Sequence, residues 1–170
     1  MKVVVAVVVF DRFENVKEWI RCFNMCETQG AQLVIIHNYD SIEAKEAYSG
    51  YCEKSGITYI PHENIGYDIG RLQDVCRNRL EGFPNYEYLI WVTDDCLPMR
   101  KDFIRQYIDK MKPDIGCAAM EISKSVRLHI RTTGFCIPKH VAERLQFIAD
   151  PITTKEQCYQ FEHRGGARTF

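Results

Sequence analysis

Two adjacent aspartates, Asp94 and Asp95, are the residues of this sequence best placed to do chemistry. They follow an apolar, strand-forming run in the stretch YLIWVTDDCLPM, residues 88–99. Burying two neighbouring carboxylates is costly unless a cation sits between them. Carboxylates without a histidine or cysteine pair beside them suit a hard cation, Mg²⁺ or Mn²⁺, whose other ligands are usually water and substrate phosphates. The stretch therefore predicts a metal site for a diphosphate-bearing ligand; the alternative is a turn, where aspartate is also common.

Short apolar runs alternate with amphipathic segments, and these elements must position the aspartates. Strands are expected at residues 3–10, 33–37, 57–61, 88–92, 115–122 and 127–137. Helices are expected at about 14–28, 41–51, 69–80, 101–111 and 138–148, and in the tail at 153–164, with Ser41 as an N-cap. This order predicts an α/β fold, a three-layer α/β/α sandwich with a mostly parallel, Rossmann-like central sheet. No linker divides residues 1–170, so a single domain is expected.

Polar residues follow each of the first four expected strands. The carboxyl ends of parallel strands meet at one edge of the sheet, which is where such folds bind ligands. The residues at these ends are Asp11 and Arg12, then Asn38, Asp40 and Ser41, then Asn64 to Arg71, and finally Thr93, Asp94 and Asp95. Their convergence indicates a binding site at that edge.

Charge and cysteine content narrow the class of protein. A formal net charge of -1 gives no basic footprint, so we expect no nucleic-acid partner. The apolar residues 3–10 are too few for a transmembrane segment, which takes about 20 residues. DRFEN follows them in place of a signal-peptide cleavage site. The eight cysteines include no C-x-x-C pair, and we expect reduced, mostly buried thiols in a cytoplasmic protein.

The loop NIGYDIGR, residues 64–71, has glycines only at positions 66 and 70. This spacing matches neither the dinucleotide-binding G-x-G-x-x-G pattern nor the P-loop pattern. A dinucleotide dehydrogenase and a P-loop kinase are therefore disfavoured. The glycines either let the backbone approach a ligand or shape a turn, and both interpretations stay open.

Five segments taken in order resemble the nucleotide-sugar-dependent glycosyltransferases of the GT-A fold, nearest to the family 2 type. They are VVVAVVVFDRFENVKEWI, LVIIHNYDS, ENIGYDIGRLQDVCRN, YLIWVTDDCLP and HIRTTGFCIPKHV, and together they cover most of the chain. The resemblance implies transfer of a sugar from a nucleoside-diphosphate sugar donor to a glycan or other hydroxyl acceptor, with inversion. It also implies a Mn²⁺ or Mg²⁺ cofactor that neutralises the leaving diphosphate.

The resemblance implies a role for the residues at each strand end. Asp95 would bind the metal, and Asp94 would contact the ribose or give a second metal contact. Thr93 stands where the first acid of the family's Asp-x-Asp element often lies. The residues implied to line the nucleotide-sugar pocket are Phe10, Asp11, Arg12, Asn38, Asp40, Asn64, Gly66, Asp68 and Arg71.

The tail TTKEQCYQFEHR resembles the element that carries the catalytic base of inverting members. Glu156 stands in the base position, with Arg164 downstream and Gln157 where a second acid is usual. The alternative is that Glu156 is a solvated helix residue, as exposed glutamates commonly are. Reserve candidates for the base are Glu121 and Glu162. A histidine completes the metal shell in some GT-A enzymes, but for His129 and His163 the sequence favours a surface or hydrogen-bonded role, because neither has a partner at ligand spacing.

Two other functions compete with glycosyl transfer. The first is a non-catalytic nucleotide-sugar-binding or assembly module that keeps the same fold. The second is a sugar-phosphate nucleotidyltransferase, which would require a glycine-rich, basic loop after the first strand. FDRFEN at that place contains neither glycine nor lysine, so the sequence favours the other two functions.

Overall fold

The computed structural model describes residues 1–120, 122–123, 129–130 and 133–164. Side chains are described for these residues except at positions 122–123, 129–130 and 162–164. Glu121 therefore lies outside the described residues, and so do the side chains of His129, Glu162 and His163.

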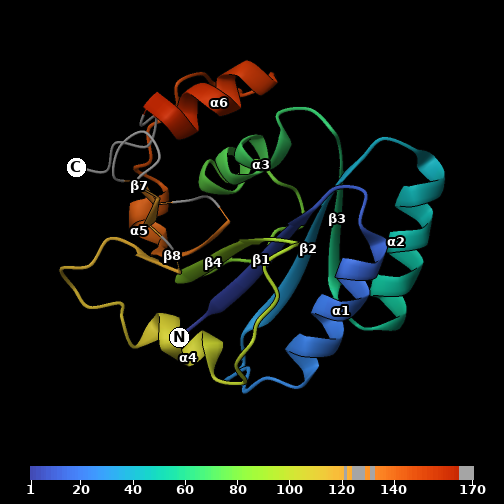
Figure 1. The fold of residues 1–170 in the computed structure, drawn as a ribbon, viewed down its shortest axis with the longest axis horizontal. Coiled ribbons are helices and arrows are strands. Elements are labelled where there is room, and N and C mark those ends of the chain that lie inside the picture. The colour runs from blue at the N-terminus through green and yellow to red at the C-terminus, as the bar shows by residue number, and fades with distance from the viewer. Residues whose placement is uncertain (121, 124–128, 131–132, 165–170) are drawn as a thin grey trace.

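A six-stranded mixed sheet forms the centre of the fold, in the order β3-β2-β1-β4-β8-β5 (Figure 1). The four parallel strands are β1 (Val3–Val9), β2 (Gln32–Tyr39), β3 (Thr58–Glu63) and β4 (Tyr88–Thr93). The antiparallel strands are β8 (Gly134–Pro138), which pairs with β4, and β5 (Ala118–Ala119), which pairs with β8. The predicted α/β class with a mostly parallel sheet is confirmed.

Helices cover both faces of this sheet. The first face carries α1 (Phe13–Asn24), α2 (Ile42–Lys54) and α4 (Phe103–Ile108). The second face carries α3 (Tyr67–Cys76) and α5 (Lys139–Ala142). The last helix, α6 (Lys155–Arg164), packs on α3 (Figure 1).

The all-apolar sequence of β1 explains its central place. Val3, Val5, Val7 and Val9 pack into the core beneath α1, and the alternate residues from Val4 to Val8 pack beneath α3. Successive side chains of a strand point to opposite faces, so only a strand that is apolar throughout can be buried between two helical layers. The Ser41 hydroxyl accepts from the Ala44 N–H at 3.1 Å, which confirms the predicted N-cap of α2.

Two of the predicted strands are wrong in extent. Residues 115–122 do not form one strand, because Ala118–Ala119 pairs with β8 whereas β6 (Ile122–Ser123) pairs with β7 (His129–Ile130) in a separate two-stranded sheet. The predicted strand 127–137 is divided in the same way between β7 and β8.

Most of the predicted helices are longer than the observed ones, whereas α2 continues beyond its predicted end at Tyr51 to Lys54. α1 stops at Asn24 because the Glu27 N–H donates to the Lys101 carbonyl at 2.8 Å. α3 stops at Cys76, just before Asn78 takes a left-handed φ of 52°. The helix predicted over 138–148 ends at Ala142, since the Arg77 guanidinium takes the carbonyls of Glu143 and Leu145 at 3.1 and 2.9 Å.

The cysteine and membrane predictions can be compared with the same structure. All eight cysteines are free thiols, and Cys52, Cys76, Cys136 and Cys158 are buried. In the part of the chain that the structure describes, none of the helices has the length and apolar character needed to cross a bilayer.

Candidate functional site

Asp94 and Asp95 lie directly after β4, at the carboxyl edge of the parallel strands. The backbone N–H of Asp94 donates to the Val8 carbonyl at 3.1 Å, which fixes the pair beside the end of β1. The Asp94 side chain is only 11% exposed, whereas that of Asp95 is 54% exposed. One carboxylate is therefore part of the fold, and the other is open to a ligand.

Arg12 supplies a cation between the two carboxylates. Its Nη1 lies 3.9 Å from Asp94 Oδ1 and 3.8 Å from Asp95 Oδ2. The other oxygens of the pair accept hydrogen bonds, Asp94 Oδ2 from Asn15 Nδ2 at 3.3 Å and Asp95 Oδ1 from Thr93 Oγ1 at 2.6 Å. The start of α1 thus holds Asp94, and the last residue of β4 holds Asp95.

The pKa values of the two carboxyl groups are shifted in opposite directions. Burial raises the pKa of Asp94, although the positive charge of Arg12 and the hydrogen bond from Asn15 oppose that shift. The hydrogen bond from Thr93 lowers the pKa of Asp95. Asp95 is therefore the carboxylate held most firmly in its ionised form, which is the form that binds a metal.

The donor set fits a hard cation. One cationic nitrogen already lies within 4 Å of both an Asp94 and an Asp95 oxygen, so a single positive charge can face both carboxylates. Among the described residues, no group of three or more His, Cys, Asp or Glu side chains gathers into a complete metal cage. Mg²⁺ and Mn²⁺ commonly take one or two carboxylates and complete their shell with water and substrate phosphates. Asp95 and Asp94 fit that kind of site.

A cavity of about 170 Å³ lies beyond the ends of β1 and β2. It brings together four of the predicted pocket residues, Phe10, Asp11, Asn38 and Asp40. Asn38 is 3% exposed, and its Oδ1 is buried without a hydrogen-bond partner in the described structure. A buried acceptor without a donor is costly, so this oxygen is suited to an N–H or O–H group of a ligand.

The sequence reasoning missed one residue that lines this cavity, His37, and two tyrosines that contact it. His37 lies between the cavity and Tyr48, with the two rings stacked at 3.8 Å. The Tyr48 hydroxyl donates to the Phe10 carbonyl at 3.3 Å, and His37 Nδ1 is hydrogen-bonded to the Tyr59 hydroxyl at 2.8 Å. Burial lowers the pKa of His37 to about 4, so the imidazole is neutral at pH 7. A histidine closing the apolar run LVIIH was the available signal.

The third predicted loop joins the same edge through its backbone. The Asn64 N–H donates to the Tyr39 carbonyl at 3.2 Å, which places this loop beside the end of β2. Asp68 follows in the first turn of α3. Arg71 is buried, and its Nη2 donates to the Ile65 carbonyl at 3.0 Å and pairs with Asp74 at 2.9 Å. Arg71 therefore supports the loop from beneath.

Gly66 has a clear structural requirement. Its φ is 80°, and a Cβ at this position would lie 2.2 Å from the backbone oxygen of Ile152. The Cys158 thiol donates to the Gly66 carbonyl at 3.3 Å. The glycine thus allows a close approach between the loop after β3 and the segment that leads into α6.

Glu156, the predicted base, is exposed in the first turn of α6. Its Oε1 accepts from Gln160 Nε2 at 2.6 Å. The role of Glu156 as a base remains a prediction.

Comparison with known proteins identifies the fold. The sequence matches no protein-family model and no curated protein. Solved structures do match. The mannosyltransferase PcManGT from Pyrobaculum calidifontis, in complex with GDP-Man and Mn²⁺, has a TM-score of 0.66 at 13% identity over 84% of this chain and 46% of its own. S. aureus TarS has a TM-score of 0.57 at 15% identity, over 99% of this chain and 57% of its own.

The galactosyltransferase LgtC matches as well, with a TM-score of 0.58 at 12% identity over 100% of this chain and 66% of its own. The fold is therefore that of the GT-A-type glycosyltransferases, as the sequence resemblance implied. The chain spans about half to two thirds of the length of these three proteins.

Proposed function

We propose that this chain is a metal-dependent glycosyltransferase that moves a sugar from a nucleoside-diphosphate sugar to an acceptor hydroxyl, with inversion. The observation that carries the proposal is the pair Asp94 and Asp95. Both carboxylates lie within 4 Å of the Arg12 guanidinium, next to a cavity lined by Asn38. Structural neighbours support it, since PcManGT was solved with GDP-Man and Mn²⁺ and TarS with UDP-GlcNAc.

In this proposal the nucleoside occupies the cavity at the ends of β1 and β2. Asn38 Oδ1 accepts from the base or a ribose hydroxyl, and Asp11 and Asp40 accept from the same groups. The diphosphate then lies at Asp94 and Asp95. Mn²⁺ or Mg²⁺ held by Asp95 and Asp94 would supply neutralisation of the leaving diphosphate.

The remaining residues have supporting roles. Arg12, already paired with both aspartates, gives a second positive charge to the diphosphate. Glu156 takes the proton of the acceptor hydroxyl, which inversion requires of a base. We also propose a cytoplasmic location, which the eight free thiols support because stable disulfides are rare there.

Thermal stability measured with nucleotides and metals tests the proposal. UDP, GDP, ADP and CDP are each added with Mn²⁺ or Mg²⁺. At a concentration of 100 times Kd a ligand selective for the native state adds about 2.7 kcal/mol. This corresponds to an increase of about 5–11 °C in Tm for a chain of this size.

Asp95→Asn should abolish the metal-dependent part of that increase. Asp109→Asn is the matched control, because Asp109 is exposed and follows α4, outside the residues that line the cavity. A panel in which no nucleoside diphosphate raises Tm with either metal would overturn the proposal. So would an Asp95→Asn protein that responds like the wild type.

A non-catalytic nucleotide-sugar-binding module is the second candidate. It is favoured by the position of Glu156, an exposed residue of α6 that is hydrogen-bonded to Gln160. Release of the nucleoside diphosphate from the bound nucleotide sugar separates the two candidates. Binding without release in the presence of acceptors supports the module, and release supports the transferase.

A further inference from the structure

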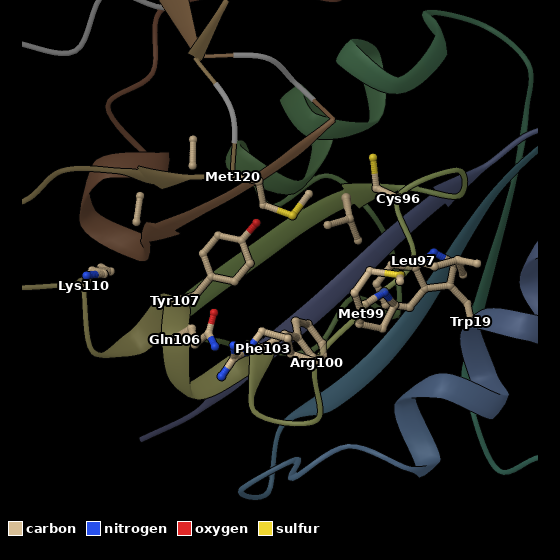
Figure 2. Close-up of a pocket in the computed structure, with 14 residues that line it drawn as sticks. Trp19, Cys96, Leu97, Met99, Arg100, Phe103, Gln106, Tyr107, Lys110 and Met120 are labelled. Carbon is tan, nitrogen blue, oxygen red and sulfur yellow. The ribbon is translucent and has the colours of Figure 1, made fainter.

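A second, larger cavity of about 340 Å³ is lined in part by the segment that directly follows Asp95, Cys96 to Arg100 (Figure 2). We call it the α4 pocket. Its residues come from α1, from β4 and the loop after it, from α4 and from β5: Trp19, Val92, Cys96, Leu97, Pro98, Met99, Arg100, Phe103, Gln106, Tyr107, Lys110, Ala118, Ala119 and Met120. The smaller cavity, which is proposed to hold the nucleoside, lies at the ends of β1 and β2, so the two cavities flank the aspartates.

The walls of the α4 pocket are mainly apolar, yet two buried polar atoms lie among them without partners. Trp19 is 1% exposed and Tyr107 is 8% exposed. In the described structure, Trp19 Nε1 and the Tyr107 hydroxyl have no hydrogen-bond partner. Figure 2 shows the Tyr107 hydroxyl pointing toward Met120. Both groups can donate, so they call for a ligand that carries an oxygen acceptor.

The rim of the pocket gives the ligand a direction. Cys96, next to Asp95, and Lys110 lie at opposite ends of the pocket (Figure 2). Arg100 is already paired with Asp102 at 3.0 Å, whereas Lys110 has no ion-pair partner among the described residues. Met99 and Met120 extend the apolar surface outward, with 92% and 58% exposure. Methionine side chains adapt readily to a flexible chain.

We propose that the α4 pocket binds an amphipathic acceptor that consists of an alkyl chain with a hydroxyl at one end and an acidic group at the other. The hydroxyl lies at the Cys96 end, beside the proposed sugar–diphosphate, and the acidic group pairs with Lys110. Trp19 Nε1 and the Tyr107 hydroxyl donate to the hydroxyl oxygen of the ligand. The acceptor role rests on the proposed function, whereas occupation of the pocket does not.

Tryptophan fluorescence gives a direct measure of binding. The chain has two tryptophans, Trp19 in the pocket and Trp91 in the core beneath α3, on the opposite face of the sheet. In the Trp91→Phe protein, Trp19 is the sole reporter. We expect 10-hydroxydecanoate to cause a saturable change in its emission. 1-Decanol, which lacks the acid, should bind about fivefold more weakly, and acetate, which lacks the chain, should cause no change.

Three variants locate the binding. Ala118→Leu fills the pocket and should weaken the binding of 10-hydroxydecanoate at least tenfold, while Ala47→Leu, the same change at an exposed position of α2, should leave that binding unchanged. Lys110→Gln should remove the preference for 10-hydroxydecanoate over 1-decanol. Tyr107→Phe should weaken both chains about fivefold. Thermal melts of each variant confirm that it is folded.

No saturable change with either chain, or equal binding by the Ala118→Leu protein, would overturn the proposal. The nucleotide response is measured separately on the same proteins. Chain binding without any nucleotide response supports the pocket and contradicts the transferase. A nucleotide response without chain binding supports the transferase and contradicts the pocket proposal.

Discussion

Replacing Gly66 by alanine tests the contact that joins the loop after β3 to the α6 segment. An added Cβ would lie 2.2 Å from the Ile152 oxygen, and Gly66 also has a positive φ of 80°. Gly56 is a matched control, because its φ is 66° and nothing lies within 4 Å of the position of its Cβ. Both substitutions place alanine in the left-handed region, but only Gly66→Ala forces two backbones apart.

The expected magnitudes follow from these two differences. The left-handed conformation costs a non-glycine residue about 1–2 kcal/mol. Forced overpacking costs about 1–3 kcal/mol more. Gly56→Ala should therefore lower the free energy of unfolding by about 1–2 kcal/mol, and Gly66→Ala should lower it by about 2–5 kcal/mol. Urea denaturation followed by circular dichroism measures both values.

A second measurement locates the damage. Cys158 is 7% exposed and donates to the Gly66 carbonyl. If Ile152 is displaced, α6 loosens and the Cys158 thiol should be alkylated faster in the Gly66→Ala protein than in the Gly56→Ala protein, as peptide mapping can measure. Equal losses of stability in the two variants, together with unchanged labelling of Cys158, would refute the claim that the Ile152 backbone requires glycine at position 66.

Three further predictions concern groups around the site. Gln73→Leu removes two 2.7 Å hydrogen bonds to the backbone of segment 149–152 and should cost about 2–4 kcal/mol in urea denaturation; a loss below about 1 kcal/mol would contradict this. His37 has a pKa lowered from 6.5 to about 4, so the unfolded state binds more protons between these values and stability should fall by about 3 kcal/mol as the pH drops through that range. The His37→Gln protein should lack this pH-dependent loss of stability. If the free energy of unfolding of the two proteins changed in parallel with pH, the prediction would be contradicted. Tyr48→Phe loses the hydrogen bond to the Phe10 carbonyl and should weaken nucleoside-diphosphate binding about fivefold in a titration, whereas unchanged affinity would mean that this bond does not hold the loop.

The parallel strands β1 and β2 were predictable because each has a distinctive local composition. Residues 3–9 and 33–36 are apolar throughout and buried on both faces, which a sequence pattern records directly. The pairing of the later strands, β5 to β8, was not predictable in this way. Nothing local indicates that Ala118 pairs with β8 while Ile122 pairs with β7, because the choice of partner depends on distant residues.

The convergence of the site residues was predictable for a geometric reason. Ends of neighbouring parallel strands must meet, so Asp11, Asn38 and Asp94 had to lie at one edge. Side-chain contacts across that edge were not predictable. The burial of Arg71 depends on how α3 packs over the loop at Ile65. The Arg12 guanidinium lies within 4 Å of both aspartates. Its position depends on where α1 starts, and no sequence motif indicates it.

The contacts of Thr93 explain how the proposed metal site would work without an acid at that position. Its hydroxyl donates to one oxygen of Asp95, lowers the pKa of that carboxyl and leaves the second oxygen facing Arg12. Asp94 is buried and has its pKa raised instead, so in the proposed site the exposed, ionised Asp95 would bind the metal while the buried Asp94 carboxyl is held by Asn15. A third carboxylate at position 93 would add repulsion to a pair that already needs Arg12. Threonine orients the ligand without that cost, and substrate phosphates can complete the metal shell.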